Sequence, residues 1–202
     1  MTDQTDIETP RLSRREKTRE KVCDAAREVF LAHGYAAATI DQIVAQAGVG
    51  RSTLYTHFAD KNEILEAIAD AYFTRVSVVI ASLEGPRPSR RQIDRWIEAF
   101  AAFTLQERSP TLLLISSSSL IDAPPAARAF GARIMRAYAA RLPAFQEALD
   151  EEGGLAWARA TAALRELSWA LVQLAEHGEG QRASNMLDVA GDLFEQLVKG
   201  WF

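Results

Sequence analysis

The stretch TIDQIVAQAGVGRSTLYTHFADK, residues 39–61, decides the fold, because it encodes two short helices joined by a tight glycine turn. Thr39 is placed to accept a free amide of the first helix, and Gln42 three residues later can complete a capping box. Gly48 ends this helix, since glycine takes positive φ without steric strain, and the second helix begins two or three residues later. The spacing predicts a helix-turn-helix.

The second of these helices has a clear inner and outer face. Leu54 and Phe58 recur at helical spacing and are predicted to face the core. The outer face then carries side chains that donate or accept hydrogen bonds, namely Arg51, Ser52, Thr53, Tyr55, Thr56 and His57. A helix of this width fits the DNA major groove, where the base edges present a readable pattern of donors and acceptors. It is therefore a candidate DNA-reading helix.

Helices also flank this motif on both sides. A longer helix precedes it from about Ser13 and ends at Gly34, with apolar residues at helical spacing between them. Asp60 and Glu63 form a further capping box and mark the start of a fourth helix. We therefore expect a disordered, acidic leader over 1–12, a helix-turn-helix domain (the head) over 13–60, and a second helical domain (the body) over 61–202.

Charge is distributed unevenly between these parts. The whole chain has a net charge of -4 and a pI near 5.5. From Arg11 to Lys21, however, bases outnumber acids by four, and the residues after Lys61 carry a net charge of -4. A solvated helix of mixed charge would explain the basic segment alone, but together with the turn motif it favours a head that binds nucleic acid.

The body is predicted to be helical throughout, because alternating β-branched runs are absent and the breaks fall at glycine and proline. Pro143 should kink or split one of its helices. Two strongly amphipathic helices close the chain, from Leu155 to about Glu176 and from Ser184 to Trp201. The fold class is therefore all-α, with about nine helices in the whole chain.

The apolar stripes of the last two helices are wide for one small domain to bury. Such helices can pair with a symmetry mate in a four-helix bundle, which would give a homodimer that reads a two-fold DNA site. The alternative is that both stripes pack on other helices of the body. The candidate interface residues are Leu164, Leu167, Leu171, Leu174, Leu193 and Leu197.

Several aromatic residues of the body could line a cavity for a small molecule, and the four serines at 116–119 leave room and supply hydroxyls. Aromatic stripes are also typical of an ordinary core, and serines of close helix packing, so both interpretations stay open. The ligand cannot be identified from the residues. The candidate ligand-binding residues are Trp96, Phe100, Phe103, Ser117, Tyr138 and Trp169.

From about Arg15 to Ile68 the sequence resembles the TetR family of bacterial transcriptional regulators. The resemblance is carried by Ala25, Phe30, Gly34, Thr39, Ile43, AGVGRSTLYTHF at 47–58, and Lys61. It implies an all-helical homodimer in which an effector bound in the body moves the fourth helix and releases DNA. Most members repress, and nothing about the effector carries over.

The same resemblance assigns roles to individual residues. Arg51, Ser52 and Thr56 would face bases. The residues that would hold phosphates are Thr39, Thr53, Tyr55, His57 and Lys61. The chain departs from the family at Gly50, where serine is frequent; glycine caps a helix nearly as well but loses a possible phosphate contact.

Other classes of protein are poorly supported. The three histidines are far apart, and the catalytic motifs of metalloproteases and serine hydrolases are missing, so we expect no enzyme and no cofactor. Cys23, the single cysteine, can form neither an intramolecular disulfide nor a thiolate metal cage, which fits the cytoplasm. No run approaches the length that spans a bilayer. The remaining alternative is a DNA-binding protein with a solid body that is controlled by a protein partner.

Overall fold

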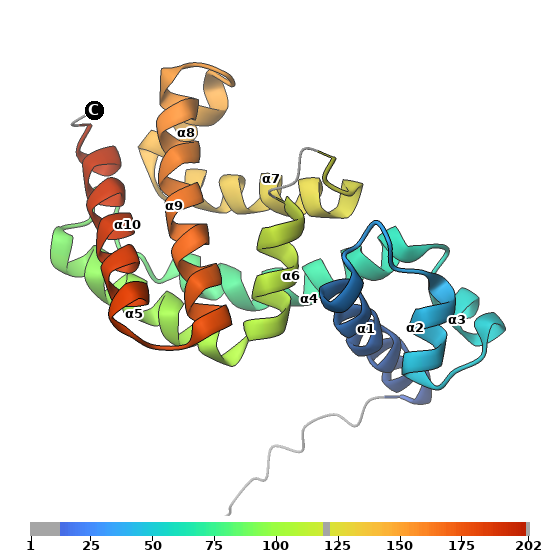
Figure 1. The fold of residues 1–202 in the computed structure, drawn as a ribbon. Coiled ribbons are helices and arrows are strands. Elements are labelled where there is room, and N and C mark those ends of the chain that lie inside the picture. Colours follow the sequence, from blue (N-terminus) through green and yellow to red (C-terminus); the bar gives the residue numbers. More distant parts are fainter. Residues whose placement is uncertain (1–12, 119–121, 201–202) are drawn as a thin grey trace, which may run out of the picture.

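The computed structural model describes residues 13–118 and 122–200, so the expected leader lies outside the described residues. Ten α-helices and no strands occur in this part of the chain, which confirms the all-α prediction. The helices, coloured along the chain in Figure 1, are α1 (Arg14–His33), α2 (Ile40–Ala47), α3 (Arg51–His57), α4 (Lys61–Ala81), α5 (Arg90–Gln106), α6 (Arg108–Ser118), α7 (Pro125–Ala139), α8 (Pro143–Asp150), α9 (Leu155–His177) and α10 (Gln181–Lys199).

The predicted helix-turn-helix is present as α2 and α3. The Thr39 hydroxyl accepts from the Gln42 amide at 3.2 Å, and the Gln42 carboxamide accepts from the Thr39 amide at 2.9 Å, so both halves of the capping box form. Gly48 follows α2 in the left-handed region with a φ of 58°. Because a side chain is strained in that conformation, glycine permits the sharp turn between the two helices.

The three helices of the head share a small core. Phe30 from α1, Ile43 from α2 and Leu54 from α3 are all buried, and Phe58 closes the core just after α3. α1 packs on α2, α4 and α6. In Figure 1 the head occupies one end of the molecule. The boundary proposed at residues 60 and 61 falls between α3 and α4.

Helix α4 runs without a break from the head into the body (Figure 1). The Asp60 carboxylate accepts from the Glu63 amide at 2.9 Å, as expected for its N-cap. The reciprocal bond was predicted wrongly, because the Glu63 carboxylate accepts from the amide of Ala59 at 2.6 Å and not from that of Asp60. The extended backbone at Asp60 leaves the preceding amide within reach of the glutamate.

The body is formed by α5 to α10 around an aromatic core. Trp96 of α5, Tyr138 of α7, Phe145 of α8 and Phe194 of α10 contact one another with ring centroids 4.9 to 5.9 Å apart. α9 packs on α10 along its length, and the two run side by side in Figure 1. The wide apolar stripes of the sequence are therefore largely used inside the protomer.

Two helix boundaries differ from the expectation. Pro143 splits the predicted seventh helix and occupies the first turn of α8, where its missing amide leaves no bond unmade, so ten helices occur among the described residues instead of about nine. The last helix starts at Gln181 instead of Ser184. Its predicted end at Trp201 lies outside the described residues.

Candidate functional site

The outer face of α3 is exposed as the sequence predicts. Leu54 and Phe58 are buried, whereas the side chains at positions 51 to 53, 55 and 56 face solvent. Tyr55 is 49% exposed, so its side chain is open to solvent. His57 is half-buried against the end of the helix. The five exposed positions form a continuous polar surface.

Two of the side chains on this surface already have partners. The Arg51 guanidinium lies 3.4 Å from the Asp41 carboxylate of α2, in an exposed ion pair. The Thr56 hydroxyl donates to the Ser52 carbonyl at 2.9 Å. Exposed pairs of this kind are worth little, about 0 to 1 kcal/mol, so either side chain can exchange its partner for a DNA group at small cost.

Thr39 has a structural role in addition to its predicted phosphate contact. Its hydroxyl accepts from the Gln42 amide and is 3.1 Å from the Gln42 carboxamide oxygen, to which it donates. The residue is exposed. A phosphate contact by its side chain would have to replace the bond to the carboxamide.

Arg19 fastens α3 to the first helix. Its guanidinium donates to the carbonyl of His57 at 2.9 Å and lies 4.2 Å from the centroid of the Phe58 ring. A cation at the C-terminal end of a helix also interacts favourably with the helix dipole. In the sequence Arg19 is recognisable only as part of the basic segment 11–21, because no local pattern indicates a contact between residues 38 positions apart.

Lys61 makes a similar clamp at the other side of the head. Its ammonium donates to the carbonyls of Tyr35, Ala36 and Ala38, at 2.8, 3.0 and 3.2 Å. It also lies 4.6 Å from the centroid of the Tyr35 ring. These bonds use all three protons of the ammonium. The first residue of α4 therefore holds the loop between α1 and α2.

The body contains a cavity of about 880 Å³ that reaches the surface. Its walls come from α4, α5, α6, α7 and α9. The lining is mostly aliphatic and aromatic with several hydroxyls, which is typical of sites for small organic molecules. Three of its lining residues, Tyr72, Val76 and Ile80, belong to α4.

The six candidate ligand residues divide into two groups. Phe100, Tyr138 and Trp169 line the cavity. Trp96, Phe103 and Ser117 are absent from its lining. Trp96 packs in the aromatic core and donates to the Val79 carbonyl at 3.0 Å. The neighbouring hydroxyls of Ser116 and Ser118, rather than that of Ser117, reach the cavity wall, because the phase of α6 turns Ser117 into the core.

The six candidate interface leucines lie mainly inside the protomer. Leu164 and Leu193 are half-buried. The other four, Leu167, Leu171, Leu174 and Leu197, are at most 6% exposed and can offer a partner little surface. The exposed apolar side chains on the same two helices are Leu155 (64%), Trp169 (50%) and Val189 (49%). Sequence periodicity could not separate these two faces, because both carry apolar residues.

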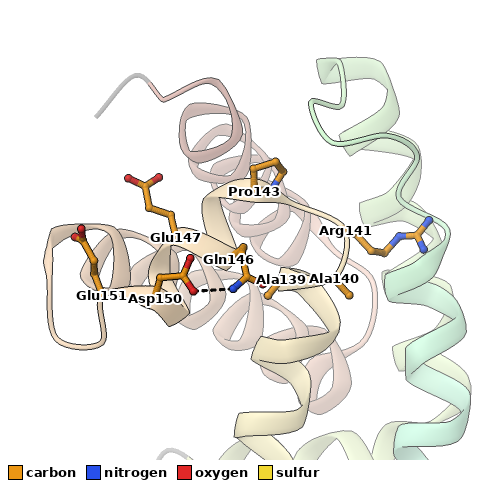
Figure 2. A pocket seen from close by; sticks show the side chains of 8 residues that line it. All are labelled: Ala139, Ala140, Arg141, Pro143, Gln146, Glu147, Asp150 and Glu151. Carbon is orange, nitrogen blue, oxygen red and sulfur yellow. Dashed lines mark hydrogen bonds between the residues drawn. The ribbon is translucent and has the colours of Figure 1, made fainter.

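A second hollow, of about 630 Å³, lies at the corner between α7 and α8. The hollow is open to solvent and its lining mixes apolar with charged side chains, among them Glu147 and Glu151, which Figure 2 shows. Two of its lining residues are bonded to each other, since Gln146 donates to Asp150 at 2.8 Å. It shares no lining residue with the cavity in the body. We do not assign it a function.

An all-helical chain whose head exposes the polar face of a short helix after a glycine turn is of the helix-turn-helix class. The family model described as bacterial regulatory proteins, tetR family, matches residues 22–68. Residues 22–68 therefore form a domain of the type found in the tetR family of bacterial regulatory proteins, in agreement with the resemblance.

Individual relatives agree with this assignment. The chain is 51% identical over 53 residues to the HTH-type transcriptional regulator SrpR of Pseudomonas putida, which covers 26% of this chain and 25% of that protein. It is 32% identical over 114 residues to the HTH-type transcriptional activator FasR of Mycolicibacterium smegmatis, covering 56% and 52%. The chain thus spans between a quarter and about half of the length of these relatives.

The fold extends the similarity beyond the head. The crystal structure of a TetR-like transcriptional regulator from Rhodococcus sp. RHA1 superimposes with a TM-score of 0.64, over 94% of this chain and 97% of that one. At 22% identity, this likeness concerns the fold alone. These relatives are named as transcriptional regulators, which agrees with the prediction that the chain is not an enzyme.

The described part of the chain contains neither a candidate membrane span nor a candidate metal site. No described helix is long and apolar enough to cross a membrane. Among the residues described, no group of His, Cys, Asp and Glu is arranged to hold a metal ion. Burial raises the pKa of the Cys23 thiol to about 11, so the thiol is not activated as a nucleophile.

Proposed function

We propose that this protein is a ligand-responsive transcriptional repressor that binds a palindromic operator as a homodimer and leaves it when a small molecule enters the body. The observation that carries the proposal is the position of α4. Its first residue, Lys61, holds the loop between α1 and α2, and its Tyr72, Val76 and Ile80 line the cavity. One helix is thus in contact with both the DNA-binding head and the cavity.

DNA reading is assigned to the exposed face of α3. Arg51 is the best candidate for base recognition, because a guanidinium can donate two parallel bonds to guanine in the major groove. Ser52 and Thr56 are the other candidates for base contacts. Tyr55, Thr53, His57 and Thr39 are proposed to hold phosphates, which would position the head without reading the sequence.

We revise the role of Lys61. The resemblance gave it a phosphate, but its ammonium is bonded to three carbonyls of the same loop. We propose that it acts by positioning the loop and the N-terminus of α2. The phosphate contact remains the competing assignment, and the salt dependence of DNA binding separates the two.

Dimerisation is proposed through the exposed apolar faces of α9 and α10. Leu155, Trp169 and Val189 are at least 49% exposed, although large apolar side chains of this kind favour burial. The two helices lie side by side, so two copies would form a four-helix bundle. A two-fold pair of heads would then meet two half-sites related by the same symmetry.

Signal transmission is proposed to pass through α4 and its contacts with α7. The Arg133 guanidinium of α7 forms an ion pair with Asp70 and lies 4.1 Å from the centroid of the Phe73 ring. The Asn62 carboxamide accepts from the Ala126 amide at 3.0 Å, in the first turn of α7. Both helices line the cavity, so a ligand that separates them would move α4 and the head.

The proposal is tested by selecting bound fragments from a random double-stranded library at several salt concentrations. We expect a short inverted repeat, whose half-sites bind one head each. Recovery of sequences without symmetry, or binding that depends on salt but not on sequence, would contradict the operator-binding homodimer. The expectation of repression comes from the family resemblance, and the relative FasR is named as an activator. A reporter gene placed behind the selected site shows whether the bound protein represses or activates transcription.

The second candidate is a DNA-binding protein that responds to a protein partner. It requires a body without a ligand site, and the cavity of about 880 Å³ argues against it. A screen of small molecules for release of the selected DNA fragment compares the two candidates directly.

A further inference from the structure

The charged side chains among the described lining residues of the cavity lie on α9. Among the described lining residues, the only ionisable side chains other than tyrosines are Arg165, which is exposed, and Glu166, which is half-buried. Because these two side chains carry opposite charges, this part of the wall favours neither a cationic nor an anionic ligand. Burial raises the pKa of Tyr72 to about 12, and the pKa of Tyr138 is also raised, so both phenols stay neutral.

A ligand with a net charge would therefore enter the cavity without a buried partner for that charge. Burying an unpaired ion costs far more than one hydrogen bond can return. Aliphatic and aromatic side chains form most of the remaining wall, including Phe100, Phe130, Ile134 and Leu164. The lining consequently favours an uncharged molecule with a large apolar surface.

Among the described residues of the wall, Thr161 carries a buried hydroxyl without a partner. The Thr161 Oγ1 atom is buried and makes no hydrogen bond with any described residue. The Tyr72 hydroxyl, by contrast, is bonded to the Thr111 hydroxyl at 2.9 Å. A buried hydroxyl without a partner has lost its bonds to water, and a ligand group bonded to it would supply the missing hydrogen bond.

A helical glycine widens the cavity on the opposite side. Gly131 lies within α7 and lines the cavity, and a Cβ atom built on it would meet nothing within 4 Å. Neither its backbone conformation nor a close neighbour therefore requires glycine. Glycine inside a helix is less stable than alanine, so this position lowers the stability of α7 and leaves room beside its backbone.

We infer that the cavity takes an uncharged, largely apolar molecule that lies against the α7 backbone at Gly131 and places a polar group on the Thr161 hydroxyl. This inference rests on the proposed function, because it names the chemical class of the effector. It also identifies Gly131 and Thr161 as residues that select the ligand, one by shape and the other by a hydrogen bond.

The first test is titration of the full-length protein with the neutral dye Nile red, followed by its fluorescence. Gly131→Leu fills the space beside α7 and should weaken Nile red binding by about tenfold or more. Ala132→Leu adds the same side chain at the neighbouring, exposed position of α7 and should leave binding unchanged. Gly131→Ala is a milder filling variant and should give a smaller loss. Thermal unfolding by circular dichroism verifies that each variant is folded.

The second test concerns the hydrogen bond. Naphthalene and 1-naphthol differ by one hydroxyl, and each can be titrated against bound Nile red. Thr161→Val keeps the shape of the side chain but removes its hydroxyl. It should weaken 1-naphthol by about threefold to tenfold and leave naphthalene unchanged or slightly tighter. An equal effect on both compounds would overturn the role of Thr161.

The anionic dye 1-anilinonaphthalene-8-sulfonate separates the inference from the proposed function. If this dye binds more tightly than Nile red and loses affinity in Gly131→Leu, the cavity is a ligand site but the inference that its ligand is uncharged is wrong. If no dye responds to Gly131→Leu, the cavity holds no ligand, and both the inference and the effector half of the proposed function fall. The library selection tests DNA reading independently of either result.

Discussion

The head and the body of this protein differ in how much their sequences reveal. Residues 39–61 combine two helix caps, a glycine turn and a polar helix face, and the head reaches 51% identity with SrpR over 53 residues. Over nearly the whole chain, the Rhodococcus structure shares the fold at 22% identity. The proposed roles account for this difference, because a DNA backbone would impose the same shape on every head that binds it, whereas each cavity would be shaped by its own ligand.

A physical reason underlies this difference. The head must present donors at fixed positions on a short helix, so caps, turn and exposed face are tied to particular residues. The body needs only apolar helix faces of adequate volume, and many combinations of apolar residues meet that need. Variants in the two regions should therefore fail in different ways.

The largest expected effect is in the core of the body. Leu171 is 3% exposed, so Leu171→Ala should lower the free energy of unfolding by about 2 to 5 kcal/mol, measured by urea denaturation at fixed protein concentration. Val189→Asp, on the exposed face of α10, should instead give folded monomers in sedimentation. Monomers from Leu171→Ala with unchanged stability would return the interface to the leucines predicted from the sequence.

The clamp of Lys61 should give the next largest effect. Lys61→Met removes three charge-assisted hydrogen bonds but keeps an apolar stem, and should destabilise the head by about 1.5 to 3 kcal/mol. Because we assign no phosphate to Lys61, the slope of log affinity against log salt should stay constant. A slope reduced by about one unit would restore the phosphate contact.

Arg51 tests the reading face directly. Arg51→Ala should cost about 1 to 3 kcal/mol at one base pair of the selected operator and relax the preference there. Tyr55→Phe is the matched comparison on the same helix, and it should weaken all sequences alike, since a phosphate contact carries no sequence information. Competition binding with single-base operator variants measures both. Unchanged selectivity in Arg51→Ala would exclude Arg51 from base reading.

The smallest effect concerns Cys23 and pH. Burial raises the pKa of the folded thiol to about 11, above its ordinary value of 9.0. Between pH 9 and pH 11 the folded state therefore keeps a proton that the unfolded state releases. Stability from this group is therefore present below pH 9 and decreases as pH rises toward 11. At pH 8, iodoacetamide should alkylate the folded thiol about a hundredfold more slowly than the thiol in urea. Equal rates would show that the thiol is accessible and ordinary.

Helical periodicity predicts the buried positions correctly where the structure depends on local residues. Leu54 and Phe58 are buried, and the Thr39 capping box forms, because these features depend on residues at most four positions apart. The assignment of Leu171 to a dimer face and of Ser117 to a cavity depended on the rotational phase of a helix against its neighbours. A stripe wide enough to cover both a core and an interface leaves that phase undetermined.

The sequence by itself determined the all-helical class, the helix-turn-helix and its exposed polar face, because caps, turn and helical spacing are local and physically specific. Only the tertiary structure decided that Arg19 and Lys61 hold the head together, that Phe100, Tyr138 and Trp169 meet around one cavity, and that Gly131 leaves it open. These contacts join residues that are mostly far apart in the chain. Their geometry follows from how whole helices pack, which no short segment specifies.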